Sequence, residues 1–424
     1  MFRHNYRVTV LERDRSPDAR PPGGTLDLHA RLGQLALDKA GLLPEFQARS
    51  RPEGQAMRIL DTDGAMLRDW RPAPADSANP EIDRGQLRDL LMDSLDIQWG
   101  RAVERLSPRT GDGMVVDFSD GQREVFDLVV GADGAWSRVR SAVSPATPHY
   151  TGVTLVETSL DNVDSFHPDL AKLIGDGSVA TYGVNRALVA QRNSGGHVKV
   201  YAQFPAPLDW HKDLDMADAD TVRSRLLDLY DGWASPTLDL LRRGTAFACR
   251  PLDVMPAAHT WPHVAGVTLI GDAAHLMPPL GVGANLALLE GAELAEAIAT
   301  SNEDIDETVR VYEEHMWARA GRWGQDSSRR LGTPGKPRPL RSPRALRCSQ
   351  SLLTARTSTT PRRRGEVVSP QKVRKILASG PRQPTATNEA TRTFAQVSAT
   401  FQRQPFMSDD CRNHGSLSEP YYDI

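Results

Sequence analysis

The sequence predicts an α/β fold in which a parallel-sheet domain is interrupted by an inserted antiparallel sheet. Residues 126–140 and 266–298 each combine a short apolar strand, a glycine-containing turn and a helix start, which is the pattern of doubly wound sheets. Between them, residues 153–204 contain several alternating or β-branched runs, which favour an antiparallel sheet. We therefore expect the chain to leave the first domain, build the inserted sheet and return.

Charge divides the chain into an acidic body and a basic end. Residues 332–424 carry 16 Lys and Arg against 6 Asp and Glu, a net charge of +10, which leaves −13 for residues 1–331 out of a total of −3. An acidic body argues against a nucleic-acid-binding core. Residues 331–424 are rich in Pro, Ser, Thr and Arg without periodicity, and we expect them to form a disordered tail.

Cysteine usage and hydropathy point to the cytoplasm. The three cysteines are scattered and lack metal-ligand spacing (Cys249, Cys348 and Cys411), which suits a reducing compartment. No apolar run approaches the roughly 18 residues of a membrane span, and no apolar core of a signal peptide follows the N-terminus. We expect a cytoplasmic monomer without membrane or nucleic-acid partners.

The first predicted strand, over residues 8–13, ends at Glu12. In dinucleotide-binding folds, an acidic residue at this place accepts hydrogen bonds from ribose hydroxyls. The phosphate-binding glycine loop should stand about 20 residues earlier, but only 11 residues precede Glu12. The sequence therefore predicts a nucleotide-binding unit that lacks its first strand, glycine loop and helix.

The next elements are two helices and a hairpin. A helix is expected over 30–40, ending at Gly41 as a typical C-terminal glycine. Residues 56–70 predict a hairpin whose turn is Asp-Thr-Asp-Gly. Leucines at helical spacing follow Asp83, which predicts a second helix with Asp83 as its N-cap.

The stretch from Gly266 to Glu290 is the most informative part of the chain. Its strand stops at Gly271-Asp272, and after a loop with two prolines an apolar helix begins near Gly283. Asp272 can accept hydrogen bonds from sugar-like hydroxyls, while the helix N-terminus offers N–H groups and positive partial charge. Together these features predict a place that holds a polar ligand.

Two motifs resemble those of a known family. Gly-Asp-Ala-Ala-His-x-Met-Pro-Pro, followed by Gly-x-Gly-Ala-Asn, resembles the second flavin motif of the FAD-dependent aromatic hydroxylases, the group A flavoprotein monooxygenases. The resemblance implies that Asp272 holds the ribityl chain and that Gly283 and Ala284 face the isoalloxazine and pyrophosphate. Residues 126–140 resemble the Asp-Gly fingerprint of the same family, which implies that Asp133 fixes a loop on the pyrophosphate.

Three further residues are assigned by the same resemblance. Ala19-Arg20, followed by Gly-Gly-Thr-Leu-Asp-Leu-His, closely resembles the tetracycline-inactivating branch of the family, which implies that Arg20 binds NADPH and Asp27 binds FAD. The family has a comparable Arg-x-x-Leu at a helix start, matched by Arg84, whose guanidinium would contact the flavin side of the cofactor.

The resemblance covers about residues 5–330 and implies an FAD-binding Rossmann-like domain, incomplete at its N-terminus. Residues 1–150 and 263–330 would form this domain, and 151–262 the inserted substrate-binding sheet. The implied activity is hydroxylation of an electron-rich aromatic, enolic or polyketide-like small molecule of secondary metabolism, using NADPH, O2 and a flavin C4a-hydroperoxide. Because the cofactor carries this chemistry, no catalytic side chain or metal site is expected.

Two alternatives stay open at this point. A flavin oxidase or halogenase could use the same scaffold, although no Trp-x-Trp-x-Ile-type segment is present. A catalytically inactive remnant acting as a binding protein is also compatible with the missing glycine loop. Within the inserted sheet four polar residues are candidates for an inward-facing position, namely Gln191, Tyr201, Gln203 and Arg250. They do not identify the substrate.

Overall fold

The computed structural model describes residues 7–19, 23–73, 78–92, 95–111, 113–279, 281–302 and 304–331. These residues all belong to one compact unit. Arg20 lies outside the described residues, and so does the predicted tail apart from Leu331. Within the described part of the chain, no helix has the length and apolar character needed to cross a membrane.

The predicted α/β class is confirmed, and the two motif strands lie side by side. β10 (Val129–Gly131) pairs in parallel with β16 (Val267–Leu269), with Gly131 opposite Leu269. β1 (Val10–Glu12) pairs in parallel with β6 (Ile97–Trp99). Because parallel strands end at the same edge, the turns that follow β10 and β16 meet there.

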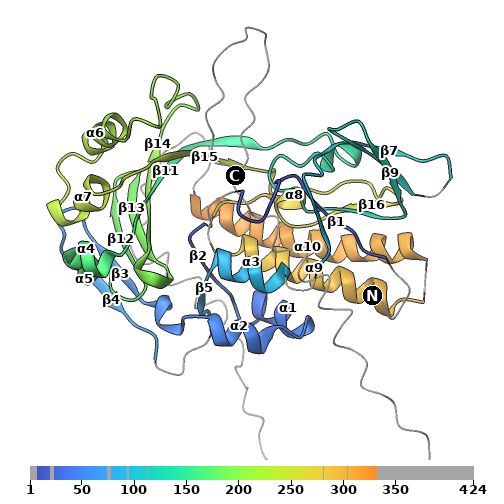
Figure 1. Ribbon diagram of the computed structural model, residues 1–424, viewed down its shortest axis with the longest axis horizontal. Helices are drawn as coiled ribbons and strands as arrows, with labels where there is room; N and C mark the ends of the chain where they lie inside the picture. Colours follow the sequence, from blue (N-terminus) through green and yellow to red (C-terminus); the bar gives the residue numbers. More distant parts are fainter. Residues whose placement is uncertain are drawn as a thin grey trace, which may run out of the picture. The chain divides into compact units, whose positions relative to one another are not determined.

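Five helices accompany these strands (Figure 1), and their bounds are α1 Gly33–Lys39, α2 Leu43–Arg49, α3 Arg84–Met92, α9 Gly283–Thr300 and α10 Ile305–Leu331. The Ala- and Leu-rich α9 is buried along most of its length, as expected for a helix rich in apolar residues. Leu288 and Leu289 of α9 pack into one core with Leu37 of α1, Phe46 of α2 and Leu91 of α3.

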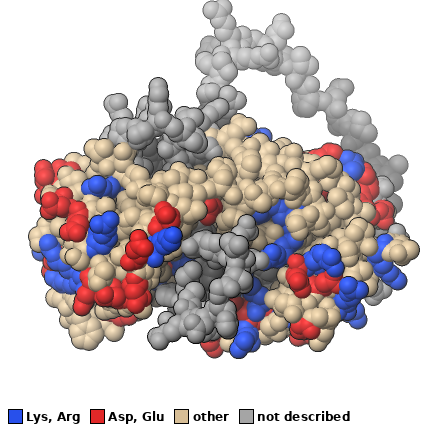
Figure 2. Space-filling view, turned by 90° about the horizontal axis from the view of Figure 1, so that it is seen from above, with Lys and Arg blue, Asp and Glu red and all other residues tan. Residues whose placement is uncertain are grey.

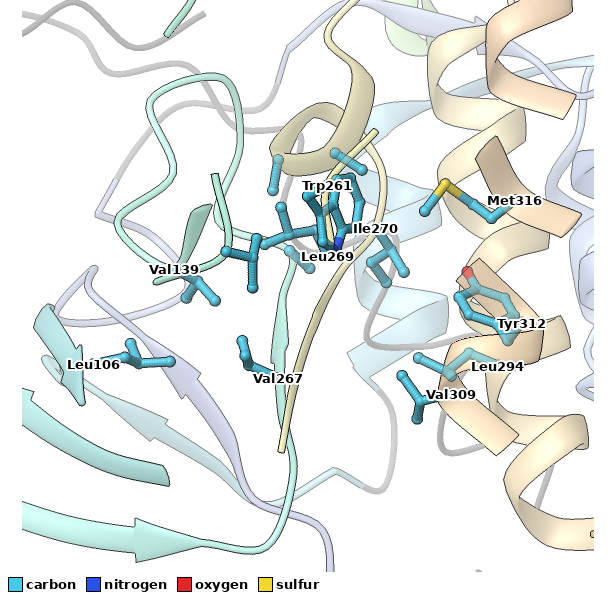
Figure 3. Close-up of a cluster of buried hydrophobic side chains, with 14 of the residues drawn as sticks. Leu106, Val139, Trp261, Val267, Leu269, Ile270, Leu294, Val309, Tyr312 and Met316 are labelled. Carbon is cyan, nitrogen blue, oxygen red and sulfur yellow. The ribbon is translucent and has the colours of Figure 1, made fainter. Parts of the chain in front are cut away.

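A second core fixes α10 and α9 against β16 (Figure 3). Tyr312 and Met316 of α10 pack with Leu294 of α9 and with Leu269 and Trp261. This packing joins α9, which follows the Gly271-Asp272 motif, to β16, which precedes it. The motif is therefore held from both ends.

A seven-stranded sheet forms the second part of the unit, with the strand order β15-β11-β14-β13-β12-β3-β4. Its strands are β3 Met57–Leu60, β4 Met66–Trp70, β11 His149–Leu160, β12 Ser178–Gly183, β13 Arg186–Arg192, β14 Val198–Pro205 and β15 Ala248–Val254. All neighbours are antiparallel except β12 and β3. The hairpin predicted over 56–70 thus extends this sheet through a parallel pair. The domain boundaries proposed from the sequence stay predictions.

The two faces of this sheet have different neighbours. One face packs four helices, α4 (Val163–Phe166), α5 (Pro168–Ile174), α6 (Ala219–Leu229) and α7 (Ser235–Arg242), through residues such as Val200 and Phe204. Figure 1 shows these helices on the side away from α3 and α9. The opposite face contacts the segment that contains Gly23 and Gly24, since a Cβ on Gly24 would lie 2.5 Å from the Tyr201 hydroxyl. That face is therefore turned toward the predicted site.

The remaining strands are short. β2 (Thr25–Asp27) and β5 (Glu81–Asp83) form an antiparallel pair, and β7 (Val103–Pro108), β8 (Met114–Phe118) and β9 (Arg123–Phe126) form a meander. Asp83 stands directly before α3, as the sequence predicts, and its role as N-cap stays a prediction. Asp83 is the last residue of β5, and its carboxylate accepts the Ser194 N–H at 3.0 Å, because a partner 111 residues away in the sequence folds onto it.

Charged side chains of both signs are interspersed on the described surface seen in Figure 2. Many of them pair locally. Arg310 on α10, for example, contacts Glu307 and Glu314 at 2.6 Å each. Exposed pairs of this kind contribute about 0–1 kcal/mol each, so the buried contacts below determine the geometry of the site.

Candidate functional site

Asp272 opens the single helical turn α8 (Asp272–His275), directly after β16 and a sharp bend at Gly271. Gly271 has φ +60°, and a Cβ there would lie 3.0 Å from the Ala287 Cβ, so the bend favours glycine. The half-buried Asp272 carboxylate makes no hydrogen bond within the described residues. Burial raises its pKa, and the nearby charges of His275 and Arg84 oppose that rise. The acceptor oxygens of Asp272 thus remain available for a ligand.

Side chains from three other segments fix this turn. Arg140 donates to the carbonyls of Ala273 (2.7 Å) and Asp272 (3.1 Å). The His259 ring lies 2.9 Å from the carbonyl of Ala274, and the Gly271 N–H donates to Glu290 at 2.8 Å. Because so short a helix satisfies few of its own carbonyls and N–H groups, these contacts hold Asp272 in place.

Arg140 also connects the two motifs. Its guanidinium donates to the Ala135 carbonyl at 2.6 Å, inside the Asp-Gly loop, in addition to its bonds to α8. Arg140 is only 3% exposed. Burial lowers its pKa to about 10, although Asp133 and Asp272 raise it, so the group is still a cation at neutral pH. This role of Arg140 could not be predicted from the sequence.

Asp133 shapes its own loop. Its carboxylate accepts hydrogen bonds from the Ser137 hydroxyl (2.5 Å) and from the N–H groups of Arg138 (2.7 Å) and Val139 (3.2 Å). These bonds occupy both carboxylate oxygens. The predicted contact of this loop with a pyrophosphate stays a prediction.

The start of α9 lies beside Asp27. α9 begins at Gly283 with no side-chain cap among the described residues, so its first N–H groups, including those of Gly283 and Ala284, can face a ligand. The preceding Gly281 has φ +86°, and its nearest non-neighbour atoms are the Asp27 carboxylate oxygens, 3.7 and 3.8 Å from an added Cβ. Asp27 also pairs with His29 at 3.0 Å.

Asn285 connects the start of α9 to the segment around Asp27 and His29, a role that was not predicted from the sequence. Its amide oxygen accepts the N–H groups of His29 (2.8 Å) and Gly33 (3.1 Å), and its amide nitrogen donates to the carbonyls of Asp27 (2.8 Å) and Gly281 (3.2 Å). All four bonds are long-range or turn contacts of a side chain that is 1% exposed. The only sequence signal for them was the Asn in Gly-x-Gly-Ala-Asn.

Arg84 begins α3, immediately after β5, and its N–H donates to the Gly24 carbonyl at 3.0 Å. Gly23 makes room for the side chain, because a Cβ there would lie 2.6 Å from the Arg84 Cδ. The charge of Arg84 acts on the pKa of Asp272, so the structure brings these two predicted residues to one place.

Glu12 belongs to a different part of the unit. It is 7% exposed at the end of β1, where its carboxylate accepts the Asp14 N–H at 3.0 Å and its carbonyl accepts the Arg101 N–H at 2.8 Å. These contacts belong to the β1–β6 pair. The predicted ribose contact of Glu12 stays a prediction.

The register places all four polar candidates of the sheet on the face that meets Gly24. Tyr201 and Gln203 are two residues apart in β14 and therefore share a face. Gln191 lies opposite Lys199 of the same face. Arg250 lies opposite Leu155, which in turn lies opposite Gln203. Arg250 is paired with Glu157 at 2.8 Å. Burial raises the pKa of Tyr201 to about 12, so its hydroxyl keeps its proton and can donate.

Glu81 lies next to this site, on the strand paired with that of Asp27, and it predicts a pH dependence of stability. Glu81 lies opposite Asp27 and accepts the Thr25 hydroxyl at 2.6 Å. Burial, with Asp27 nearby, raises the pKa of Glu81 from 4.5 to about 7. A carboxyl whose pKa is raised by folding lowers the stability of the folded protein once it ionises. The effect is absent below the pKa of the unfolded chain and complete above the pKa of the folded protein.

Glu81→Gln is therefore expected to gain stability over the unsubstituted protein as pH rises from about 4.5 to about 7. The gain should reach about 3 kcal/mol and then level off. Urea unfolding of both proteins at several pH values measures it. A stability difference that does not change with pH would show that Glu81 titrates normally in the folded protein.

Comparison with known proteins identifies the family of the chain. A family model described as FAD binding domain matches residues 6–314. Monooxygenase asqM of Emericella nidulans is 31% identical over 350 residues, which cover 70% of this chain and 78% of that protein. Relatives of this kind are named monooxygenases and hydroxylases.

Two solved structures share the fold. HpxO of Klebsiella pneumoniae, in complex with FAD and uric acid, has a TM-score of 0.64 at 21% identity, covering 81% of this chain and 85% of that one. The tetracycline destructase Tet(55) has a TM-score of 0.61 at 21% identity, covering 83% and 90%. The matched model, the monooxygenase relatives and the flavin motifs agree that the chain belongs to the FAD-binding-domain family and is an FAD-dependent monooxygenase.

Proposed function

We propose that this enzyme uses NADPH and O2 to add one oxygen atom to an electron-rich aromatic or enolic small molecule. The observation that carries the proposal is the Asp272 carboxylate, which is buried enough to have a raised pKa and yet makes no hydrogen bond within the described residues. Asp272 is only partly buried, so a ligand can reach these oxygens. Ribityl hydroxyls of FAD would donate hydrogen bonds to them.

The other residues at this place fit FAD as well. The uncapped start of α9 at Gly283 and Ala284 offers N–H groups and positive partial charge to the flavin and the pyrophosphate. Gly23 and Gly281 lack a Cβ where the chain approaches Arg84 and Asp27. We assign Asp272, Asp27, Arg84, Gly283 and Ala284 to FAD, with Asp133 shaping the adjacent loop, and we retain Arg20 for NADPH and Glu12 for the adenosine ribose.

When bound, FAD supplies the redox chemistry, accepting a hydride from NADPH and activating dioxygen. The protein binds, orients and excludes water. The sheet face that carries Tyr201, Gln203 and the Arg250–Glu157 pair would cover the substrate. It offers a hydroxyl, an amide and a charge-balanced ion pair, which suit a polar ring system with oxygen substituents. The uric acid bound by the HpxO neighbour is a small molecule of this type.

The test is substrate-dependent NADPH oxidation by the full chain supplied with FAD. A panel of phenols, enols and polyketide-like compounds should contain members that accelerate NADPH loss and gain one labelled oxygen atom when isotopically labelled dioxygen is used. Hydrogen peroxide without labelled product would favour the oxidase alternative. A halide-dependent product would favour the halogenase, and no NADPH loss with any compound would favour the inactive binding protein.

A further inference from the structure

The turn that presents Asp272 ends in a buried ion pair. His275 stands three residues after Asp272, and its Nε2 lies 2.7 and 2.8 Å from the two carboxylate oxygens of Glu290 on α9. Glu290 is 0% and His275 7% exposed. The same carboxylate accepts the N–H of Gly271, so one buried group holds both ends of the turn.

This pair favours a protonated imidazole. A carboxylate buried without a cation costs several kcal/mol, and His275 is the only group paired with Glu290 through a salt bridge in the described residues. Burial lowers the pKa of His275, but Glu290 and Asp272 outweigh that effect and the pKa is raised. A positive charge therefore lies one helical turn from Asp272, on the same face.

We propose that His275, held by Glu290, is a positioning residue that keeps the Asp272 carboxylate ionised and oriented toward FAD. The inference rests on the proposed function, because it assigns a purpose to Asp272 as a flavin ligand. Ribityl hydroxyls donate to an ionised carboxylate more strongly than to a protonated one. A lone carboxylate at this depth, beside Glu290, would take up a proton more readily.

Several other charged groups lie near the turn and also act on Asp272. Asp272 faces Arg84 on α3, Arg140 beside the Asp-Gly loop, His275 on its own turn and Glu290 on α9. His275 also faces His259, whose pKa is lowered by burial. His259 contacts the same turn through the Ala274 carbonyl and also contacts Ser144 at 2.9 Å. It is therefore a matched control that contacts the turn without a permanent charge.

The experiment measures the FAD dissociation constant of the full chain, by quenching of flavin fluorescence, from about pH 5 to about pH 9. For the unsubstituted protein, affinity should fall as pH falls through the pKa of Asp272. His275→Gln should move the midpoint of that fall upward by about 1–3 pH units. Glu290→Gln should move it less, because it also removes the negative charge of Glu290, which raises the pKa of Asp272. Asp272→Asn should lose this transition, and His259→Gln should weaken binding at every pH without moving the midpoint.

Each outcome separates the inference from the proposed function. An unmoved midpoint in His275→Gln, with a transition lost in Asp272→Asn, would overturn the role of His275 alone. Unchanged FAD affinity in Asp272→Asn would overturn the site assignment on which the inference rests. If His275→Gln fails to give a native thermal transition, the double variant His275→Gln with Glu290→Gln removes both charges at once, and a smaller upward shift of the midpoint is expected, because the charge of His275 acts on the pKa of Asp272 more strongly than that of Glu290.

Discussion

Replacing Arg140 with methionine is expected to abolish FAD binding and to lower the free energy of unfolding by about 3–5 kcal/mol. Arg140 is buried and donates to carbonyls of the Asp-Gly loop and of α8. Without it these carbonyls lose their donors, and the two acidic side chains nearby, Asp133 and Asp272, lose a cation. The turn that presents Asp272 would then be free to shift.

Arg140→Lys is the matched control. Lysine keeps the charge but cannot bridge two loops with a planar fork of donors, so we expect an intermediate loss of stability and of FAD affinity. Denaturant unfolding and FAD titration measure both quantities for both variants. FAD affinity in Arg140→Met equal to that of the unsubstituted protein would show that the connection between the motifs does not matter for the site.

Replacing Glu313 with alanine is expected to cost about 3–5 kcal/mol of stability. Glu313 on α10 is fully buried and accepts hydrogen bonds from the Trp261 indole N–H (3.1 Å), the Thr268 hydroxyl (2.8 Å) and the His263 ring (2.8 Å). Its removal leaves these donors without a partner inside the core drawn in Figure 3, where Trp261 packs beside Ile270 and Leu269.

Glu313→Gln separates packing from hydrogen bonding. Glutamine has nearly the same shape but only one acceptor oxygen, so its loss of stability should be about half that of Glu313→Ala. Thermal and urea unfolding measure both. Equal losses in the two variants would mean that the carboxylate charge, and not the number of satisfied donors, stabilises α10 on β16.

Local patterns were enough to predict the main parts of the fold. The apolar runs before Asp133 and Asp272 are strands, the helix expected near Gly283 begins there, and the alternating runs of the inserted region form one sheet. These features depend on neighbours within a few residues of each other, and propensity and periodicity report such neighbours directly.

The contacts that hold the site could not be predicted in this way. Arg140 bonds to Ala273, 133 residues later, and Asn285 bonds to His29 across 256 residues. No spacing rule connects such positions. The bond from the Ser194 N–H to the Asp83 carboxylate spans 111 residues and could not be predicted either. The residues proposed to face the ligand stand in local motifs, whereas the residues that hold those motifs in place are distant in the sequence.

FAD binding by the full chain tests most directly whether Asp272 and the start of α9 hold FAD. The purified protein, titrated with FAD, should acquire the absorbance spectrum of bound flavin with a stoichiometry of one flavin per chain. Asp272→Ala should lose that bound flavin while keeping its thermal transition. Failure of the unsubstituted chain to bind FAD, or full retention of flavin by Asp272→Ala, would contradict the account.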